Sequence, residues 1–259
     1  MPDPEVFYDD LAEDYHLIYA DWRQSVRRQG EVLDRLVRAR HGGSPRSVLD
    51  GSCGIGTQAI GLALRGYTVH ASDISAAAVA RAQREAAVFE VDIAFDVADL
   101  RTMAENVPGT FDIVLSCDNS LPHLLTDADI DAALRNMRAK LAPDGLLLIG
   151  LRDYDVLAAE RPRLTPAQLT GDPDHPAITF QHWEWADDGS TYDLTLFLTR
   201  RQADGWHTTA RATRYRALRR DDLERMLARA GFDDIRWHAP DATGHHQPLV
   251  TARISGHAP

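Results

Sequence analysis

The stretch Asp50-Gly51-Ser52-Cys53-Gly54-Ile55-Gly56 has the composition of a turn that binds a nucleotide-like ligand. It follows an apolar run and precedes a helical pattern that begins at Thr57. Glycine adopts backbone conformations that other residues avoid, and it lets main chain approach a ligand closely. The N–H groups at the start of the following helix would face that ligand. A tight packing turn is the alternative interpretation of the same pattern.

Two aspartates follow later apolar runs, and each has a group to recognise on a nucleoside. Asp73 ends the run 68–72, where a carboxylate can accept both hydroxyls of a ribose held by the first turn. Asp99 follows the run 93–97 and can accept from the exocyclic amine of an adenine. Either acid can instead cap a turn or a helix. Because no lysine follows the glycine turn to meet phosphates, the two acids favour a nucleoside.

Short apolar runs alternate with helical patterns from Ser47 onward, which predicts βαβ units. We expect strands at 47–50, 68–72, 93–97, 111–116, 145–150, 234–238 and 248–254, and helices at 57–65, from 75, at 127–141 and at 221–230. The fold class is therefore α/β: a Rossmann-like, seven-stranded, mostly parallel sheet with helices on both faces. Open sheets of this class bind ligands at the carboxyl ends of their strands, where the acids and glycines fall.

The segments outside this pattern predict a cap and an insertion. Residues 1–44 should form an N-terminal helical cap, with short helices in 7–22, a helix at 23–40 and a linker from Gly42 to Pro45. Residues 153–215 should form an antiparallel substrate-binding insertion over the active site. It begins with a proline-punctuated loop at 161–176, followed by strands at 178–186, 191–201 and 206–215. The core would then comprise 45–152 and 216–259.

Composition excludes several classes of function. The 259 residues are 44% hydrophobic and 26% charged, as in an ordinary globular protein, and the formal net charge is -11. An acidic surface is repelled by nucleic acid and anionic lipid, so we expect neither as a partner. The chain has neither a membrane-spanning run nor a secretory start, and we expect a cytoplasmic protein. Two cysteines argue against a disulfide framework. A monomer and a homodimer both remain open.

The order of motifs VLDGSCGIG, VHASDIS, VADL, FDIVLSCDNSLPHLL and LAPDGLLLIG resembles the class I S-adenosylmethionine-dependent methyltransferases over residues 45–150. Within that class, CDNSLPHL and the loop LRDYD are similar to the glycine and sarcosine N-methyltransferases and their small-molecule relatives. The resemblance implies an enzyme that uses S-adenosylmethionine, releases S-adenosylhomocysteine and methylates a nitrogen of a small molecule.

The substrate class stays open between an amino-acid-like amine and a nitrogen heterocycle of secondary metabolism. An O-methyltransferase acting on a small metabolite, a nicotinamide-dependent oxidoreductase and a non-catalytic binding module are the alternatives. The oxidoreductase predicts a third glycine, and Ala59 fills that position.

Site residues follow from the resemblance and from the aromatic content of the cap. The expected cofactor-binding residues are Tyr8, Tyr15, Asp50, Gly51, Cys53, Gly54, Gly56, Asp73, Ile74, Asp99, Leu100, Cys117 and Asp118. The expected substrate-binding residues are Asn119 and Arg152, by resemblance, and Phe180, Trp183 and Trp185, as aromatics for stacking. An arginine suits a substrate carboxylate, although it can also pair with Asp153 or Asp155. The tryptophans can instead serve only to pack the insertion.

Methyl transfer to nitrogen requires alignment, removal of water and a neutral amine. His123 and Asp118 are the candidate proton acceptors, with ordinary packing as the alternative for His123. Tyr8, Tyr15 and Tyr19 can surround a sulfonium with aromatic faces, and we count Tyr15 among the catalytic candidates. The pair His245-His246 suggests a metal, but no spacing nearby completes a site, so we expect none.

Overall fold

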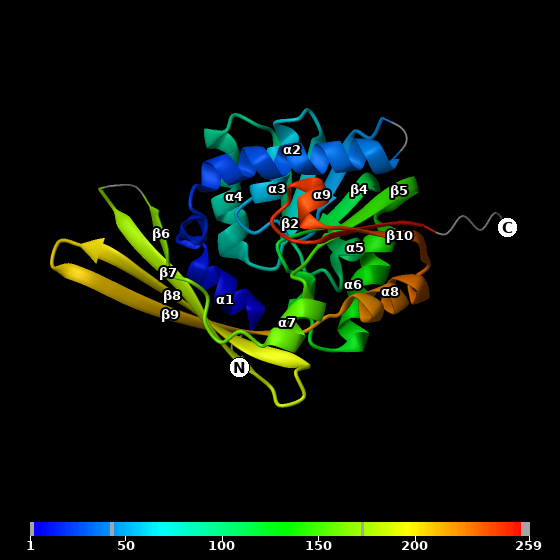
Figure 1. Cartoon of the computed structure of the whole chain (residues 1–259). Helices are drawn as coiled ribbons and strands as arrows, with labels where there is room; N and C mark the ends of the chain where they lie inside the picture. The colour runs from blue at the N-terminus through cyan, green and yellow to red at the C-terminus, as the bar shows by residue number, and fades with distance from the viewer. Residues whose placement is uncertain (1–2, 42–43, 172–173, 255–259) are drawn as a thin grey trace.

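The computed structural model describes residues 3–41, 44–171 and 174–254. Its core is a seven-stranded sheet in the order β10-β11-β5-β4-β1-β2-β3 (Figure 1). The strands are β1 (Ser47–Asp50), β2 (Thr68–Asp73), β3 (Ile93–Val97), β4 (Phe111–Ser116), β5 (Leu141–Gly150), β10 (Phe232–His238) and β11 (Leu249–Ile254). The first five are parallel, and β11 joins β5 and β10 antiparallel. The predicted fold class is confirmed.

Helices cover both faces of this sheet because side chains along each strand alternate between them. On one face, Val48 and Ile113 pack with α2 (Trp22–His41) and α3 (Thr57–Ala63). On the other, Leu49 and Val114 pack with α6 (Asp127–Ala139) and α8 (Arg220–Arg229). The helices α4 (Ala76–Val88) and α5 (Met103–Asn106) follow β2 and β3. In β1, β4 and β5, nearly continuous runs of buried residues explain why the strands were predictable.

Two glycines set how closely α2 approaches α3. A Cβ atom on Gly30 would lie 2.3 Å from the carbonyl oxygen of Gly61, and one on Gly61 would lie 2.5 Å from that of Val26. The two helix backbones therefore touch, which no larger side chain at either position allows. This contact holds the cap helix against α3, whose first turn follows the glycine turn.

Antiparallel strands form a second sheet in the order β6-β7-β8-β9, which extends away from the core (Figure 1). Its strands are β6 (Gln168–Gly171), β7 (Pro176–Trp185), β8 (Thr191–Gln202) and β9 (Gly205–Arg216). The expectation of a loop throughout 161–176 is wrong, because β6 pairs with β7 from Gln168 to Gly171. Its four residues carry only one buried side chain, Thr170, and such a short edge strand has little periodicity to read.

Short elements complete the chain. The predicted cap helices are α1 (Pro4–Leu11) and the 3-10 helix η1 (Tyr15–Ile18). The elements η2 (Leu121–His123), α7 (Tyr154–Glu160) and α9 (Pro240–Thr243) were not predicted. Gly42 and Gly43 of the expected linker lie outside the described residues. Among the described helices, none combines the length and apolar character needed to cross a bilayer.

Candidate active site

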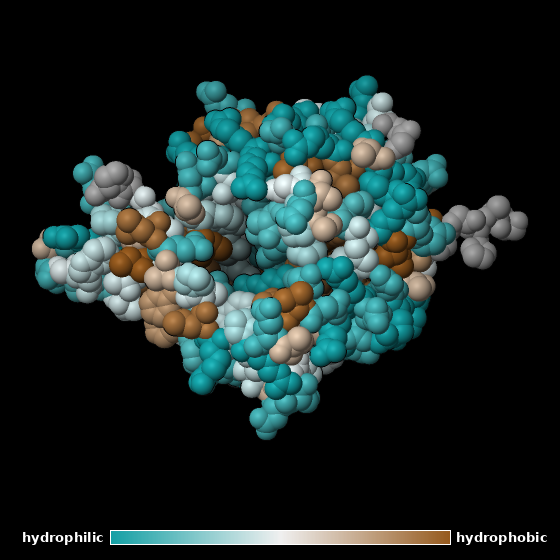
Figure 2. Space-filling model, viewed as in Figure 1, coloured by the Kyte–Doolittle hydropathy of each residue, from teal (hydrophilic) through white to brown (hydrophobic). Residues whose placement is uncertain are grey.

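A cavity of about 480 Å³ opens at the carboxyl ends of β1, β2 and β3. Figure 2 shows the surface hollowed where the insertion meets the core. The cofactor candidates that line the cavity are Tyr8, Tyr15, Gly51, Cys53, Gly54, Asp73, Ile74, Asp99, Leu100 and Asp118. Parallel strands bring these residues to one edge although they are distant in sequence.

Gly51 and Gly54 both line this cavity, and Gly54 leaves open space above its backbone. Its φ is +52°, and a Cβ atom built on it meets no protein atom within 4 Å, so its exposed backbone faces open space. Gly56 has a different role, because it lies outside the cavity lining, has φ +92° at the start of α3, and a Cβ atom built on it would lie 3.0 Å from Ile60. The expected contact of Gly56 with a ligand is therefore not supported by its position.

Asp50 and Cys117 also lie beneath the cavity rather than in its wall. Both are buried, and burial raises the pKa of the Asp50 carboxyl to about 8. Its Oδ1 accepts the N–H of Ser52 at 3.3 Å, whereas its Oδ2 has no partner among the described atoms. Asp50 and Cys117 therefore support the glycine turn from behind. Their positions in the sequence did not show whether they support the turn or contact the ligand directly.

Asp73 has the geometry expected of a ribose-binding carboxylate. Its Oδ2 accepts the N–H of Gly54 at 2.8 Å, and its Oδ1 accepts the N–H of Ser75 at 3.0 Å. A carboxylate oxygen can accept two hydrogen bonds, so each retains one for a ligand hydroxyl. Burial raises the pKa of Asp73, although the backbone N–H groups oppose that shift.

Asp99 lines the cavity, but a neighbouring guanidinium holds its carboxylate. Nε of Arg101 lies 2.9 Å from Oδ2, and the backbone N–H of Arg101 donates to Oδ1 at 2.8 Å. These contacts are those expected if Asp99 caps a turn, which was the alternative interpretation of this residue. Leu100 and Ile74 line the same cavity and supply apolar surface for a flat ring.

A second cavity of about 560 Å³ lies beside the first, between the cap and the insertion. Among the described residues, four line both cavities: Tyr8, Tyr15, Tyr19 and Asp118. Burial raises the pKa of all three phenols, which keeps them neutral. These four residues, hereafter the neck, mark the place where a group can pass between a ligand in one cavity and a ligand in the other.

Arg152 lines the second cavity and makes no ion pair with a carboxylate within the described residues. Its Nη1 donates to the hydroxyl of Tyr192 at 2.6 Å, and its guanidinium carbon lies 4.7 Å from the ring centre of Trp183. The expected alternative, pairing with Asp153 or Asp155, is wrong because both acids pair with Arg220. Arg152 thus presents a positive charge to the cavity.

Asn119 holds Arg152 from behind instead of lining either cavity. Its Oδ1 accepts the backbone N–H of Arg152 at 3.1 Å and the hydroxyl of Tyr154 at 2.9 Å. Its Nδ2 is buried without a partner among the described atoms. Asp118 and Asn119 both have left-handed backbones, with φ of +53° and +69°, a conformation that Asp and Asn adopt more readily than most other residues.

The three insertion aromatics expected to contact the substrate, Phe180, Trp183 and Trp185, do not line the second cavity. Phe180 was expected to contact the substrate, but its ring stacks on that of Phe197, with ring centres 4.8 Å apart. Phe180 lies on the face of β7 opposite to Gln181, and Gln181 lines the cavity. The structure therefore contradicts the expected contact of Phe180. Trp183 is buried between Arg152 and Tyr192. Trp185 stacks on Tyr192 and donates its indole N–H to the carbonyl oxygen of Pro162. Packing therefore accounts for both tryptophans.

His123 lines the first cavity, but the protein occupies both of its ring nitrogens. Nε2 lies 2.8 Å from the hydroxyl of Tyr8, and Nδ1 lies 3.3 Å from that of Thr213. Burial, assisted by the charge of Arg152, lowers the pKa of His123 to about 3. These contacts favour the packing interpretation, in which His123 joins the cap to β9.

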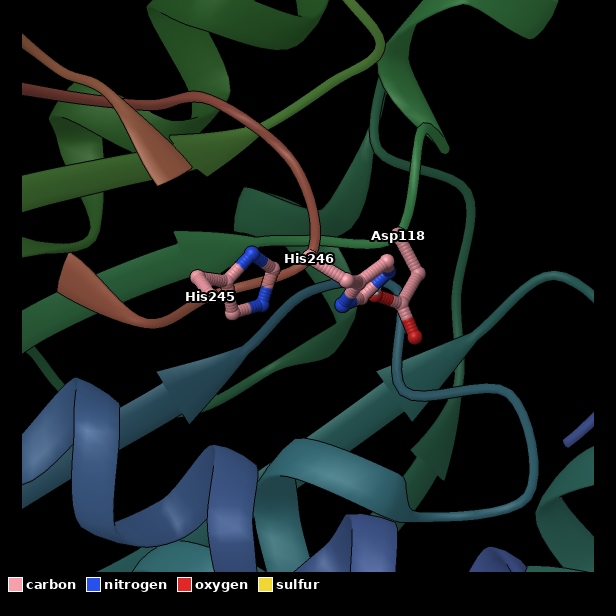
Figure 3. A group of neighbouring side chains, drawn as sticks. All are labelled: Asp118, His245 and His246. Carbon is pink, nitrogen blue, oxygen red and sulfur yellow. Dashed lines mark ion pairs between the residues drawn. The ribbon is translucent and has the colours of Figure 1, made fainter. Parts of the chain in front are cut away.

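Tertiary structure brings Asp118 to the histidine pair that the sequence left without a third ligand (Figure 3). One donor atom from each of Asp118, His245 and His246 lies within 4.8 Å of the others. Nε2 of His246 lies 3.2 Å from Oδ1 of Asp118, and Oδ2 accepts the hydroxyl of Tyr19 at 2.8 Å. Burial would raise the pKa of Asp118, but the adjacent His246 lowers it to about 2, although Oδ1 has no partner of hydrogen-bond geometry among the described atoms.

Sequence reasoning missed several lining residues. Those of the first cavity include Ser52, Thr57, Gln58 and Leu124, and those of the second include Gln168, Gln181, Tyr215, His245 and His246. Ser52, Thr57 and Gln58 adjoin the glycine turn, so proximity to that motif was a usable signal. The others come from distant elements, and no local pattern marks them.

Residues 48–145 match the model of a methyltransferase domain family. The chain is 34% identical over 137 residues to a glycine/sarcosine N-methyltransferase of Parasynechococcus marenigrum, covering 53% of this chain and 48% of that protein. It is 31% identical over 140 residues to the dTDP-3-amino-3,6-dideoxy-alpha-D-glucopyranose N,N-dimethyltransferase of Streptomyces fradiae. That match covers 54% of this chain and 52% of that protein. The matches thus span about half of these two relatives.

The fold has solved counterparts. A sugar N-methyltransferase from a Streptoalloteichus species superposes with a TM-score of 0.77 at 20% sequence identity, covering 95% of this chain and 94% of that one. At that identity the likeness concerns the fold, including the antiparallel sheet beside the core.

Proposed function

Because the chain carries a class I S-adenosylmethionine-dependent methyltransferase domain, we propose that it transfers a methyl group to the nitrogen of a small amine. The observation that carries this proposal is the neck, where Tyr8, Tyr15, Tyr19 and Asp118 line two adjoining cavities at once. One cavity would hold the methyl donor and the other the acceptor. Close approach of two ligands is the main requirement of an in-line displacement.

The residues of the first cavity fit the cofactor. Asp73 has acceptor capacity for two ribose hydroxyls, Ile74 and Leu100 would flank the adenine, and the open space over Gly54 would admit the methionine part. S-Adenosylmethionine supplies an electrophilic methyl group on a positively charged sulfur. The neutral phenol rings of the neck present π faces that attract such a cation.

The second cavity favours an amine that also carries an anionic or hydrogen-bond-accepting group. Arg152 offers its guanidinium there, with the amides of Gln168 and Gln181 nearby. Apolar wall comes from Leu194 and Leu196. A space of about 560 Å³ exceeds what glycine would fill, so we propose a larger acidic amine or an amino sugar derivative. Trp183 packs against Arg152, so it is not available to stack on a heterocycle.

In this proposal the chain keeps its three-part division. The cap of residues 1–44 closes both cavities through α1 and η1, because Asp9 accepts the Ser75 hydroxyl at 2.6 Å and the N–H of Ala77 at 3.1 Å. The insertion of residues 153–215 supplies the wall opposite the core. Closure of this kind removes water from a reaction that water would slow.

Incubation with S-adenosylmethionine and a panel of amines tests the function. The panel comprises glycine, sarcosine, larger amino acids, nucleotide-linked amino sugars, nitrogen heterocycles and matching alcohols. Mass spectrometry should detect a gain of about 14 daltons, one methylene, on an acidic amine or amino sugar. A gain on oxygen alone would overturn N-methylation. Calorimetric binding of S-adenosylmethionine without any methylated product would indicate a non-catalytic binding module.

A further inference from the structure

A histidine adjoins the neck from the far end of the chain. His246 belongs to the loop between α9 and β11, lines the second cavity, and places Nε2 3.2 Å from Oδ1 of Asp118 (Figure 3). Asp118 lines both cavities. His246 is exposed, with 44% of its side chain accessible, so it can exchange protons with solvent.

The reaction needs a proton acceptor, because a protonated amine has no lone pair to attack with. The three candidates named from the sequence, His123, Asp118 and Tyr15, are poor proton acceptors. His123 has both nitrogens engaged and a pKa of about 3, and the pKa of Asp118 is about 2. Tyr15 has a raised pKa and stays a phenol, which cannot accept the proton usefully. Imidazole is the side chain suited to general base catalysis near neutral pH.

The loop that carries His246 is held in place by its neighbour. His245 is buried, with Nε2 3.3 Å from Oε1 of Gln29, and the N–H of Gln247 donates to its Nδ1 at 3.3 Å. Arg28 of α2 donates to the carbonyl oxygen of Gly244 at 2.9 Å. Asp118 and His245 contact His246. The other charged and titratable groups that line the same cavity are Tyr8, Tyr15, Tyr19, Tyr215, Arg28 and Arg152. Asp118 faces Nε2, which leaves Nδ1 to accept a proton.

We propose that His246, oriented by Asp118, accepts the proton of the substrate ammonium. This rests on the proposed function. The N–H bond breaks, the proton goes to Nδ1 of His246, and the electron pair stays on the amine nitrogen. That nitrogen then forms the new C–N bond as the methyl–sulfur bond breaks and its electron pair stays on sulfur. His246 afterwards loses the proton to solvent, while Asp118 balances the charge of the imidazolium.

A shared metal is the competing use of the same side chains, since Asp118, His245 and His246 carry suitable donor atoms. The contacts of His245 argue against it, because both of its nitrogens already have partners on α2 and in its own loop. The two imidazole rings also pack against each other, with centres 4.4 Å apart and planes 35° apart. A metal would have to break these contacts.

The first test needs no substrate. Long-range ¹H–¹⁵N NMR spectra of the whole protein report which ring nitrogen of His246 carries hydrogen, with the signal assigned by its loss in His246→Asn. We expect the Nε2–H form of the neutral ring, facing Asp118, with Nδ1 unprotonated. The Nδ1–H form would overturn the proposal. A joint response of His245 and His246 to one equivalent of Zn²⁺ would also overturn it and indicate a metal site.

The second test uses the amine identified by the mass-spectrometric panel. His246→Asn should lower kcat about 100-fold at pH 7, the lower range for loss of a general base. The residual rate should rise about tenfold per pH unit as solution supplies the free amine, and imidazole should partly rescue His246→Ala. The matched control is His207→Asn. His207 is paired with Asp204 at 2.7 Å, and it lines neither cavity.

Calorimetry separates this proposal from the proposed function. His246→Asn should bind S-adenosylmethionine within about twofold of the parent, as expected for a substitution outside the first cavity. Normal kcat and an unchanged pH profile in His246→Asn would overturn the role of His246 while leaving methylation intact. A parent protein that methylates no amine would overturn the proposed function, and the NMR result would still decide whether Asp118 orients His246.

Discussion

The carboxylate of Asp73, at the end of β2, accepts the N–H of Gly54 at 2.8 Å across the mouth of the first cavity. One side chain thus holds the open glycine in its left-handed conformation and keeps acceptor capacity for a ligand. Recognition of the ribose and the shape of the turn are therefore coupled in this protein. A change at Asp73 acts on both.

Replacement of Asp73 by Asn should weaken binding of S-adenosylmethionine. Hydrogen bonds to a charged group contribute about 1.5–3 kcal/mol, so we expect Kd to rise roughly 10- to 100-fold. Isothermal titration calorimetry measures the change, and circular dichroism checks the fold. Asp96→Asn is the matched control, since Asp96 lies on β3, pairs with His70 and lies outside the cavity. Equal affinities of parent and Asp73→Asn would contradict the ribose assignment.

Replacement of Arg152 by Met should weaken binding of the amine substrate and leave binding of the cofactor unchanged. Loss of a charge-assisted contact costs about 1.5–3 kcal/mol, so KM should rise at least tenfold. Affinity for S-adenosylmethionine should stay unchanged, because Arg152 lines only the second cavity. Arg220→Met is the control, as it removes a guanidinium that pairs with Asp153 outside both cavities. An unchanged KM in Arg152→Met would contradict the proposal that the substrate carries an anionic group.

His123 should make the protein less stable as the pH falls. Its folded pKa of about 3 lies below the ordinary 6.5, so the unfolded chain binds the proton more readily between these values. The free energy of unfolding should drop by about 1.4 kcal/mol per pH unit from this residue below pH 6.5. Urea titrations at pH 7.5, 5.5 and 4.5 on parent and His123→Gln measure it. The variant should lose less stability with acid, and parallel losses would contradict a buried neutral His123.

Replacement of Gly30 by Ala should destabilise the fold through the contact of α2 with α3. The added methyl group would lie 2.3 Å from the carbonyl oxygen of Gly61, so the helices must separate. Overpacking typically costs about 1–3 kcal/mol, and thermal unfolding should show a lower Tm. Gln24→Ala, on the exposed side of the same helix, should leave Tm nearly unchanged. A Tm equal to that of the parent in Gly30→Ala would show that the helices tolerate separation.

The sequence by itself determined the core sheet and one wall of the first cavity. Runs such as Ile93–Val97 and Phe111–Ser116 predicted strands with the observed bounds. In Phe111–Ser116, side chains on both faces of the sheet are buried, and the sequence there is a nearly continuous apolar run. The topology of parallel strands then brings their carboxyl ends together. That is why Gly54 and Asp73 could be assigned to one cavity without a structure.

Tertiary structure alone decided which side chains meet at the neck and which only support it. Nothing local shows that His246 approaches Asp118, since 127 positions of chain separate them and the contact arises from how the last loop folds back over β4. Likewise, periodicity placed Phe180 and Trp183 on opposite faces of β7 but did not say which face looks inward. The face that carries Trp183 packs against Arg152 and the core, so Trp183 is buried, whereas Phe180 lies on the other face of the strand and stacks on Phe197.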